Sequence, residues 1–187
     1  MTLPRGFKAN AERVAVQVRG ELCVDLEAPL DIYAVAPIVG AIIVKGEDLI
    51  GRDPFEELES HQVGVFSAAT FDIDDRHIIV TNPLASEARR RSDVAHEIGH
   101  LFLKHELTEI REVGGVPFRT CRPDEEEQAT TFGGTLLLPR PTLLGAVRRG
   151  ITSPEELANI HNVSQQMARF RLYSTGVLKQ AGVARNS

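Results

Sequence analysis

The segment His-Glu-Ile-Gly-His at residues 96–100 restricts what this chain can fold into more than any other part of its sequence. Its apolar periodicity and its flanking residues predict a helix over residues 86–104. Side chains four residues apart on an α-helix point almost the same way, so His96 and His100 can offer two imidazole nitrogens to one tetrahedral Zn²⁺. Glu97 is too close in sequence to be a comfortable ligand, but its carboxylate can accept a proton from the attacking water, as a general base does.

The alternative interpretation is a helix with two surface histidines, which predicts a polar face around them. The sequence has the opposite pattern, because apolar residues lie nearly all round this helix: Val94, Ile98, Leu101, Phe102 and Leu103. Two histidines and a glutamate in a buried helix need partners, since unsatisfied polar groups in a core are costly. One metal ion satisfies all three, so the sequence predicts a metal site.

A catalytic zinc needs a third protein ligand and one open position for water. His105 and Glu106 cannot supply that ligand while the helix continues, because both point away from the two histidines. Cys121 is a further metal-binding residue type, and a role as a metal-blocking thiol is conceivable, but we interpret it as an incidental thiol. The third ligand is therefore expected from another element.

The best candidate element is a second helix, expected over residues 124–138. Its inward face is defined by Ala129, Phe132, Gly133 and Leu136, and three glutamates open its first turns. At about 100° per residue, Glu125 and Glu126 fall within about 60° of the inward face, whereas Glu127 points roughly 160° away, toward solvent. Periodicity leaves Glu125 and Glu126 as alternatives for the third ligand.

The remaining pattern predicts an α+β fold, with a small antiparallel sheet packed against a helical bundle that carries the histidine helix. The expected helices cover residues 10–22, 31–40 and 55–59, and the expected strands cover residues 41–45, 63–73 and 77–81, with a hairpin at 74–76. Gly114 and Gly115 mark a loop after the histidine helix. We place one compact domain at residues 1–150.

Residues 151–187 form two short helices joined by a tight turn. Ser153 and Ser164 are their caps, and Asn162 can adopt the left-handed conformation of the turn. This pair resembles a helix-turn-helix, which reads DNA or a protein partner, but a pair that merely packs on the catalytic domain is the simpler interpretation. Direct DNA binding therefore stays open, and the pair belongs either to its own unit or to the first domain.

Composition excludes several classes of protein. The net charge of −5 argues against a protein that mainly coats nucleic acid. Residues 1–20 lack the apolar segment of a secretory signal, and the longest apolar stretch, residues 34–44, is too short to cross a bilayer. Cys23 and Cys121 form no regular framework, which favours reduced thiols. We therefore expect a cytoplasmic protein that does not insert into membranes.

Two segments, residues 91–105 and 126–139, together with the hairpin at residues 67–83, resemble the ImmA/IrrE-type zinc metallopeptidases. The resemblance implies a zincin-like fold, with His96 and His100 as zinc ligands, Glu126 as the third ligand and Glu97 as the catalytic base. It also implies endopeptidase action on a protein partner, often a DNA-binding repressor or an antitoxin, in regulation or a stress response.

Three positions depart from the family pattern, and two functional alternatives remain. Thr130 stands where the family usually has asparagine, and Gly133-Gly134 replace two alanines, which should weaken that helix by about 1 kcal/mol each. Tyr173 and His105 are candidates for stabilising the oxyanion, although a packed tyrosine and a hydrogen-bonded histidine are the simpler interpretations. The alternatives are a metal-containing, DNA-associated regulator without proteolytic activity and a scaffold that has lost its metal.

Overall fold

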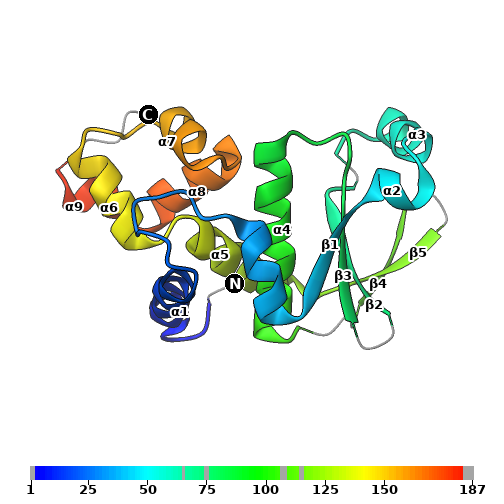
Figure 1. Cartoon of the computed structure of the whole chain (residues 1–187), viewed down its shortest axis with the longest axis horizontal. Coiled ribbons are helices and arrows are strands. Elements are labelled where there is room, and N and C mark those ends of the chain that lie inside the picture. Colours follow the sequence, from blue (N-terminus) through cyan, green and yellow to red (C-terminus); the bar gives the residue numbers. More distant parts are fainter. Residues whose placement is uncertain (1–2, 65, 74–75, 106–108, 114–115, 183–187) are drawn as a thin grey trace.

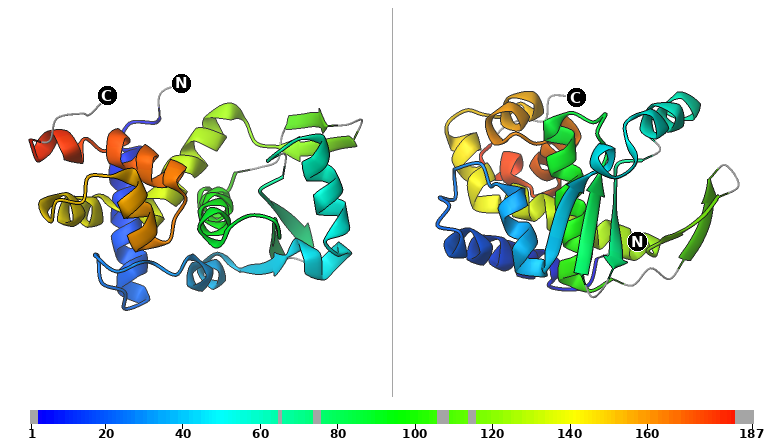
Figure 2. Two further views of the ribbon diagram at one scale, coloured as in Figure 1. Left: turned by 90° about the horizontal axis from the view of Figure 1, so that it is seen from above. Right: turned by 45° about the vertical axis from the view of Figure 1, so that its right-hand side comes forward.

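The computed structural model describes residues 3–64, 66–73, 76–105, 109–113 and 116–182. It has an α+β fold, as predicted from the sequence. Helix α4 lies between a small sheet on one side and the other large helices on the opposite side (Figure 1). Seen from above, the same helix is almost end-on in the middle of the molecule (Figure 2, left).

The described elements follow one another along the chain with short connections. The helices are α1 (Phe7–Glu21), the 3₁₀ helix η1 (Ile32–Val39), α2 (Gly46–Ile50), α3 (Asp53–His61), α4 (Glu87–Leu103), α5 (Pro123–Leu137), α6 (Arg140–Arg148), α7 (Pro154–His161), α8 (Gln165–Ser174) and α9 (Val177–Gln180). The strands are β1 (Ala41–Lys45), β2 (Ala68–Ile73), β3 (Arg76–Thr81), β4 (Glu109–Val113) and β5 (Val116–Thr120).

The main sheet has the strand order β1-β3-β2 and is mixed. β2 and β3 form the antiparallel hairpin that the sequence predicts, although its turn lies outside the described residues. The expectation of an antiparallel sheet is wrong for β1, which pairs with β3 in parallel. A parallel pair needs a long crossover, and the stretch between β1 and β3, with α2, α3 and β2, supplies it. β2 is therefore an edge strand of this sheet.

A second ribbon, β4–β5, is absent from the sequence-based expectations. Its strands pair in antiparallel, with Glu109 opposite Thr120. The ribbon projects beside the main sheet in the right-hand view of Figure 2. The loop expected at Gly114-Gly115 falls between these two strands but outside the described residues.

Helix α4 is fixed at both ends by its own sequence. The Ser86 side chain accepts a hydrogen bond from the Arg89 backbone N–H, as expected of an N-cap. At the other end Lys104 adopts a left-handed conformation with φ 54°, and its N–H bonds to carbonyl groups of the last turn. Between the ends, Val94, Ala95 and Ile98 are fully buried. The helix is thus the centre of the core.

Helices α4 and α5 approach each other closely because each of them has a glycine where it touches the backbone of the other. A Cβ atom on Gly99 would lie 2.7 Å from the Ala129 carbonyl oxygen. A Cβ atom on Gly133 would lie 2.3 Å from the Ala95 carbonyl oxygen. Real Cβ contacts essentially never fall under 3.0 Å, so these glycines allow backbone to touch backbone.

The expected helix pair, α7 and α8, is hydrogen-bonded to α4, and a third short helix, α9, follows it, which the sequence did not predict. Asn162, in the turn between α7 and α8, has the expected left-handed conformation with φ 49°. Its carbonyl oxygen accepts a hydrogen bond from Arg91 Nε at 3.0 Å. Ser92 Oγ accepts another from the Ser164 N–H at 2.9 Å. Within the described residues, no helix is long and apolar enough to cross a membrane.

Candidate metal centre

Three side chains from α4 and α5 point their ligand atoms at one place. His96 Nε2 lies 3.0 Å from His100 Nε2 and 3.1 Å from Glu126 Oε2. The distance from His100 Nε2 to the same carboxylate oxygen is 3.7 Å. Among the described residues, these three are the group of His, Cys, Asp and Glu side chains that could hold a metal ion together.

The spacing of these atoms fits a tetrahedral zinc ion. Zinc binds nitrogen and oxygen at about 2.0–2.1 Å, and tetrahedral ligands at that distance lie about 3.3–3.4 Å apart. The three measured separations, 3.0, 3.1 and 3.7 Å, bracket that value. All three atoms are acceptors in their deprotonated forms, so a cation at their centre satisfies them together. Two imidazoles and a carboxylate are also a usual ligand set of a catalytic zinc.

The structure distinguishes the three glutamates at the start of α5. Glu126 is the one beside both histidines, as the family resemblance implied. Glu125 instead accepts the Arg122 backbone N–H at 3.0 Å and thereby caps α5. Helical phase could not separate the two, because it contains no information on which glutamate caps its own helix. Glu127 is exposed, as its phase predicted.

Each histidine has a partner on its other ring nitrogen. His96 Nδ1 lies 3.2 Å from Thr130 Oγ1 of α5. His100 Nδ1 lies 3.0 Å from Nδ1 of His105, which the left-handed turn at Lys104 brings back toward α4. A hydrogen on Nδ1 of each histidine would leave its Nε2 lone pair free to face a metal ion. The threonine that departs from the family pattern therefore takes part in orienting His96.

Glu97 lies on the side of the centre that faces the sheet. Its Oε2 atom accepts a hydrogen bond of 2.6 Å from the Thr70 hydroxyl group on the edge strand β2. That bond fixes the carboxylate beside the two histidines while leaving its second oxygen available. Sequence reasoning did not single out Thr70, because its contact with Glu97 spans 27 residues and no local pattern marks it.

One comparison with known proteins decides the family. The model of the IrrE N-terminal-like domain, Peptidase_M78, matches residues 56–173, which is more than half of the chain and includes all the residues of this centre. The chain belongs to the M78 peptidase family. Membership implies a metallopeptidase-type function. No curated protein matches the chain.

The helix-turn-helix-like pair lies largely within the family domain, because the region matched by the M78 family model extends through α7 and most of α8. The boundary that we placed at residue 150 stays a prediction.

In the metal centre of this M78 family member, the histidines and the carboxylates shift each other's pKa values. Burial acts to lower the pKa of His96, but the hydrogen bond to Glu126 and the neighbouring carboxylates of Glu97 and Asp93 outweigh it, so this pKa is raised. Burial acts to raise the pKa of Glu126, but hydrogen bonds and charge from His100 and His96 hold this pKa far below its usual range. A carboxyl group with so low a pKa is ionised at neutral pH, as a metal ligand would have to be.

The group of residues that could hold the metal ion does not include three others that the sequence brought into consideration: Cys121, His105 and Tyr173. Burial, with the charges of Glu126, Glu125 and Glu97, raises the pKa of the Cys121 thiol to about 12, so this group stays protonated. His105 supports His100 instead of facing its Nε2 atom. Tyr173 lies on α8 with the Arg169 guanidinium 5.7 Å from its ring centroid. The role of His105 or Tyr173 in stabilising an oxyanion stays a prediction.

Proposed function

We propose that this chain is a zinc-dependent endopeptidase that cleaves a regulatory protein, a DNA-binding repressor or an antitoxin, in a regulatory or stress response. The convergence of His96, His100 and Glu126 next to Glu97 carries the proposal. Zinc bound by these three residues would supply a Lewis acid that polarises the scissile carbonyl group and the attacking water. The nature of the partner rests on the family resemblance.

Glu97 is the general base in this proposal. Its carboxylate takes a proton from the attacking water and passes it to the leaving amine. Thr70 orients that carboxylate through the 2.6 Å hydrogen bond. The Glu126 side chain is 39% exposed and that of His100 only 11%, so solvent reaches the centre at the carboxylate of α5.

The edge strand explains how an internal peptide segment can reach the centre. Among the described strands, β2 pairs on one side only, with β3. An extended segment can therefore pair with its free edge and run past Thr70 and Glu97. This mode of binding uses backbone groups and needs no chain terminus, so it supports endopeptidase action.

The test uses the full chain loaded with zinc and, as substrate, each DNA-binding protein whose gene lies next to its own, because a neighbouring repressor is the partner that the family resemblance implies. Mass spectrometry should find one defined cut in that partner. Glu97→Gln should keep one zinc per chain by metal analysis and lose the cut. An unchanged cleavage rate in the variant contradicts the mechanism, and a chain that holds no zinc after dialysis against it contradicts the whole proposal. We also propose the cytoplasm as the site of action, where such partners occur and where cysteines outside disulfides, such as Cys23 and Cys121, stay reduced.

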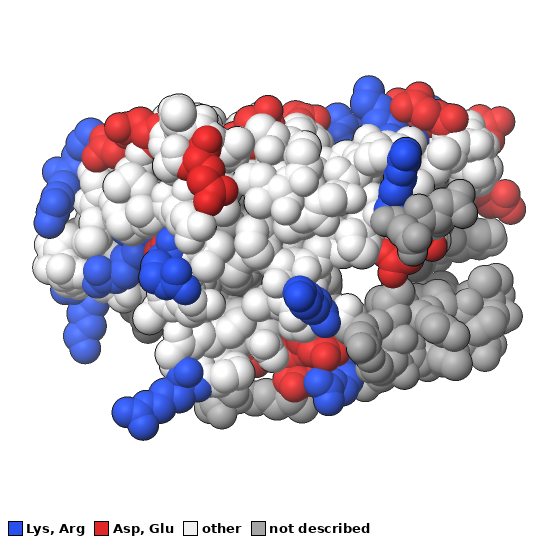
Figure 3. Space-filling view, turned by 60° about the horizontal axis from the view of Figure 1, so that its bottom comes forward, with Lys and Arg blue, Asp and Glu red and all other residues white. Residues whose placement is uncertain are grey.

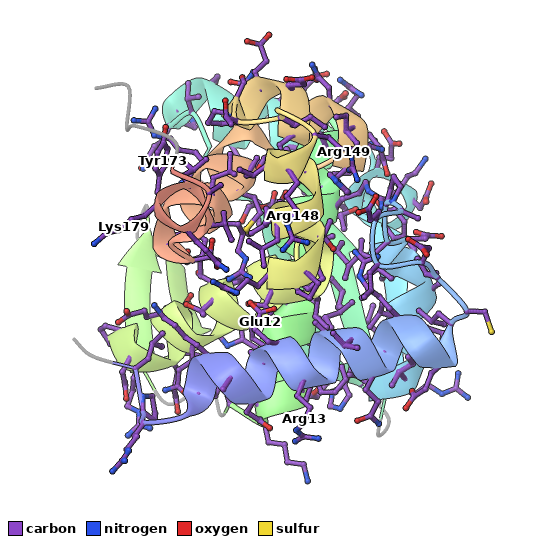
Figure 4. The ribbon with its side chains drawn as sticks, turned by 90° about the vertical axis from the view of Figure 1, so that its left-hand side faces the viewer. Glu12, Arg13, Arg148, Arg149, Tyr173 and Lys179 are labelled. Carbon is purple, nitrogen blue, oxygen red and sulfur yellow. The ribbon has the colours of Figure 1, made fainter. Side chains whose placement is uncertain are left out.

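One observation favours a second candidate function, a DNA-associated regulator without proteolysis. Residues 1–22 and 139–187 contain eleven Lys and Arg against four Asp and Glu, whereas residues 23–138 contain ten against twenty-two. Basic side chains spread over the end of the molecule formed by α1 and α6–α9 (Figure 3). Arg13, Arg148, Arg149 and Lys179 lie on one face of that end (Figure 4).

This candidate predicts a salt-dependent complex with duplex DNA. Fluorescence anisotropy at 50 and 200 mM salt measures it, because neutralised phosphates make the affinity fall steeply with salt. Arg148→Glu with Lys179→Glu should abolish such binding. Cleavage of the partner by the same preparation would favour the peptidase.

A further inference from the structure

A cavity of about 300 Å³ lies directly beside the metal centre. Four parts of the chain line it: the first half of α4, the segment before β2, α5 at Thr130, and the start of α8. His96 and Thr130 form its boundary with the centre. One water molecule occupies about 30 Å³ in the liquid, so this cavity has the volume of about ten waters, which is enough for one large amino-acid side chain.

The charged groups that line the cavity are paired with each other. Arg89 Nε lies 2.9 Å from Asp93 Oδ1. The same guanidinium donates from Nη1 to Gln166 Oε1 at 3.1 Å. Arg89 and Asp93 therefore offer no net charge to a substrate, and a charged side chain placed there would gain no counter-ion while losing its hydration.

The apolar part of the lining comes from α8. Met167 is 8% exposed and Phe170 is half-buried, and both face the cavity. Gly134 of α5 makes room for the methionine, because a Cβ atom at that position would lie 2.7 Å from Met167 Sδ. A thioether and an aromatic ring next to a neutralised ion pair form a wall that suits an apolar side chain.

We propose that this cavity is the specificity pocket of the peptidase, and that it receives an apolar side chain the size of leucine, methionine or phenylalanine from the residue next to the scissile bond. The inference rests on the proposed function and adds a substrate class to it. Met167 and Phe170 are then specificity-determining residues. The second helix of the helix-turn-helix-like pair serves as a wall of the substrate cleft.

The first test reads cleavage sites. The zinc-loaded full chain is incubated with a library of peptides derived from a digested proteome, and mass spectrometry identifies the cuts. Leu, Met and Phe should be enriched at one of the two positions that flank the scissile bond. Met167→Ala and Phe170→Ala widen the pocket, so each should lower kcat/KM for the best wild-type peptide about tenfold and shift the preference toward larger rings.

The matched control is Ile160→Ala, because Ile160 is an exposed apolar residue of α7 outside the cavity. Its cleavage pattern should equal that of the wild type. Circular dichroism checks that each variant folds, and two independent wall variants protect the test against the failure of one.

The second test reads binding without turnover. Fluorescence anisotropy measures the affinity of Glu97→Gln for two labelled peptides that differ only at the enriched position, leucine against serine. The leucine peptide should bind about tenfold more tightly, and adding Met167→Ala should remove most of that difference.

The two proposals fail in different ways. Cleavage without apolar enrichment at either flanking position, or enrichment that both wall variants leave intact, overturns the pocket and leaves the peptidase standing. No cleavage of any peptide by the zinc-loaded protein overturns both.

Discussion

Replacing Gly133 by alanine tests whether close helix packing positions the metal ligands. In an exposed helix this change stabilises the protein by about 1 kcal/mol, because alanine is the better helix former. Here the new Cβ atom would lie 2.3 Å from the Ala95 carbonyl oxygen, and contacts under 3.0 Å are essentially never found. The two helices must therefore separate by about 0.7 Å, which typically costs about 1–3 kcal/mol in a well-packed core.

The displacement should reach the metal centre. Glu126 lies seven residues before Gly133 on the same face of α5, and Ala95 is next to His96 on α4. Ligand distances in metal sites vary by only about 0.2 Å, so a shift of about 0.7 Å is large. We expect Gly133→Ala to lower the affinity for zinc about 10- to 100-fold and to lower the melting temperature by a few degrees.

The assay is competition with a chromophoric zinc chelator, combined with thermal unfolding of the metal-free protein. The matched control is Gly20→Ala, because Gly20 lies in α1 and a Cβ atom added there would have no heavy atom within 4 Å outside its own helix and neighbours. That control should bind zinc normally and melt at the same or a higher temperature. If Gly133→Ala behaves like the control in both measurements, the packing argument is refuted.

Three further predictions each concern one side chain. Thr130→Val removes the partner of His96 Nδ1 at 3.2 Å, so zinc affinity in the chelator assay should fall about 10- to 100-fold while folding is retained. Thr70→Val frees the Glu97 carboxylate, so kcat for a cleaved peptide should fall about 3- to 10-fold with zinc content unchanged; a reduced zinc content would contradict this role. His161 is buried with neither ring nitrogen hydrogen-bonded in the described structure, and burial, then Arg19 and Arg149, lowers its pKa to about 4. The unfolded chain takes up this proton near pH 6.5 and the folded protein does not, so stability should be lost as the pH falls from about 6.5 toward 4. Relative to His161→Leu in metal-free buffer, the wild type should lose about 1–2 kcal/mol between pH 8 and pH 5, and parallel stability curves would exclude this explanation.

Local signals in the sequence predicted the helices well where a cap or a periodic face marks them. Ser86, Ser153 and Ser164 all accept backbone hydrogen bonds at the helix starts where they were expected. The α+β class followed from the same signals. The parallel pairing of β1 could not be predicted, because a short β-branched strand reads the same in either orientation.

The candidate site was predictable in its composition but not in its surroundings. Helical phase reduced the third ligand to Glu125 or Glu126, and only the fold shows which of them faces the histidines. Gly133 was interpreted as a weak point of its helix, whereas the structure shows a position where a side chain has no room. Thr70 and the walls of the cavity belong to elements far apart in the chain, and periodicity carries no such information.

The left-handed residue at the end of α4 links the length of that helix to the properties of the metal centre. An ordinary L-residue in this conformation is disfavoured by roughly 1–2 kcal/mol, and Lys104 adopts it with φ 54°. One more turn of helix would carry His105 to the opposite side, and His100 would lose its partner at 3.0 Å. The residue at which α4 ends therefore determines whether His105 can hydrogen-bond to His100 and strengthen it as an electron donor. A mutation at this helix end, which touches neither the ion nor the peptide, can thus alter the chemistry of the metal centre.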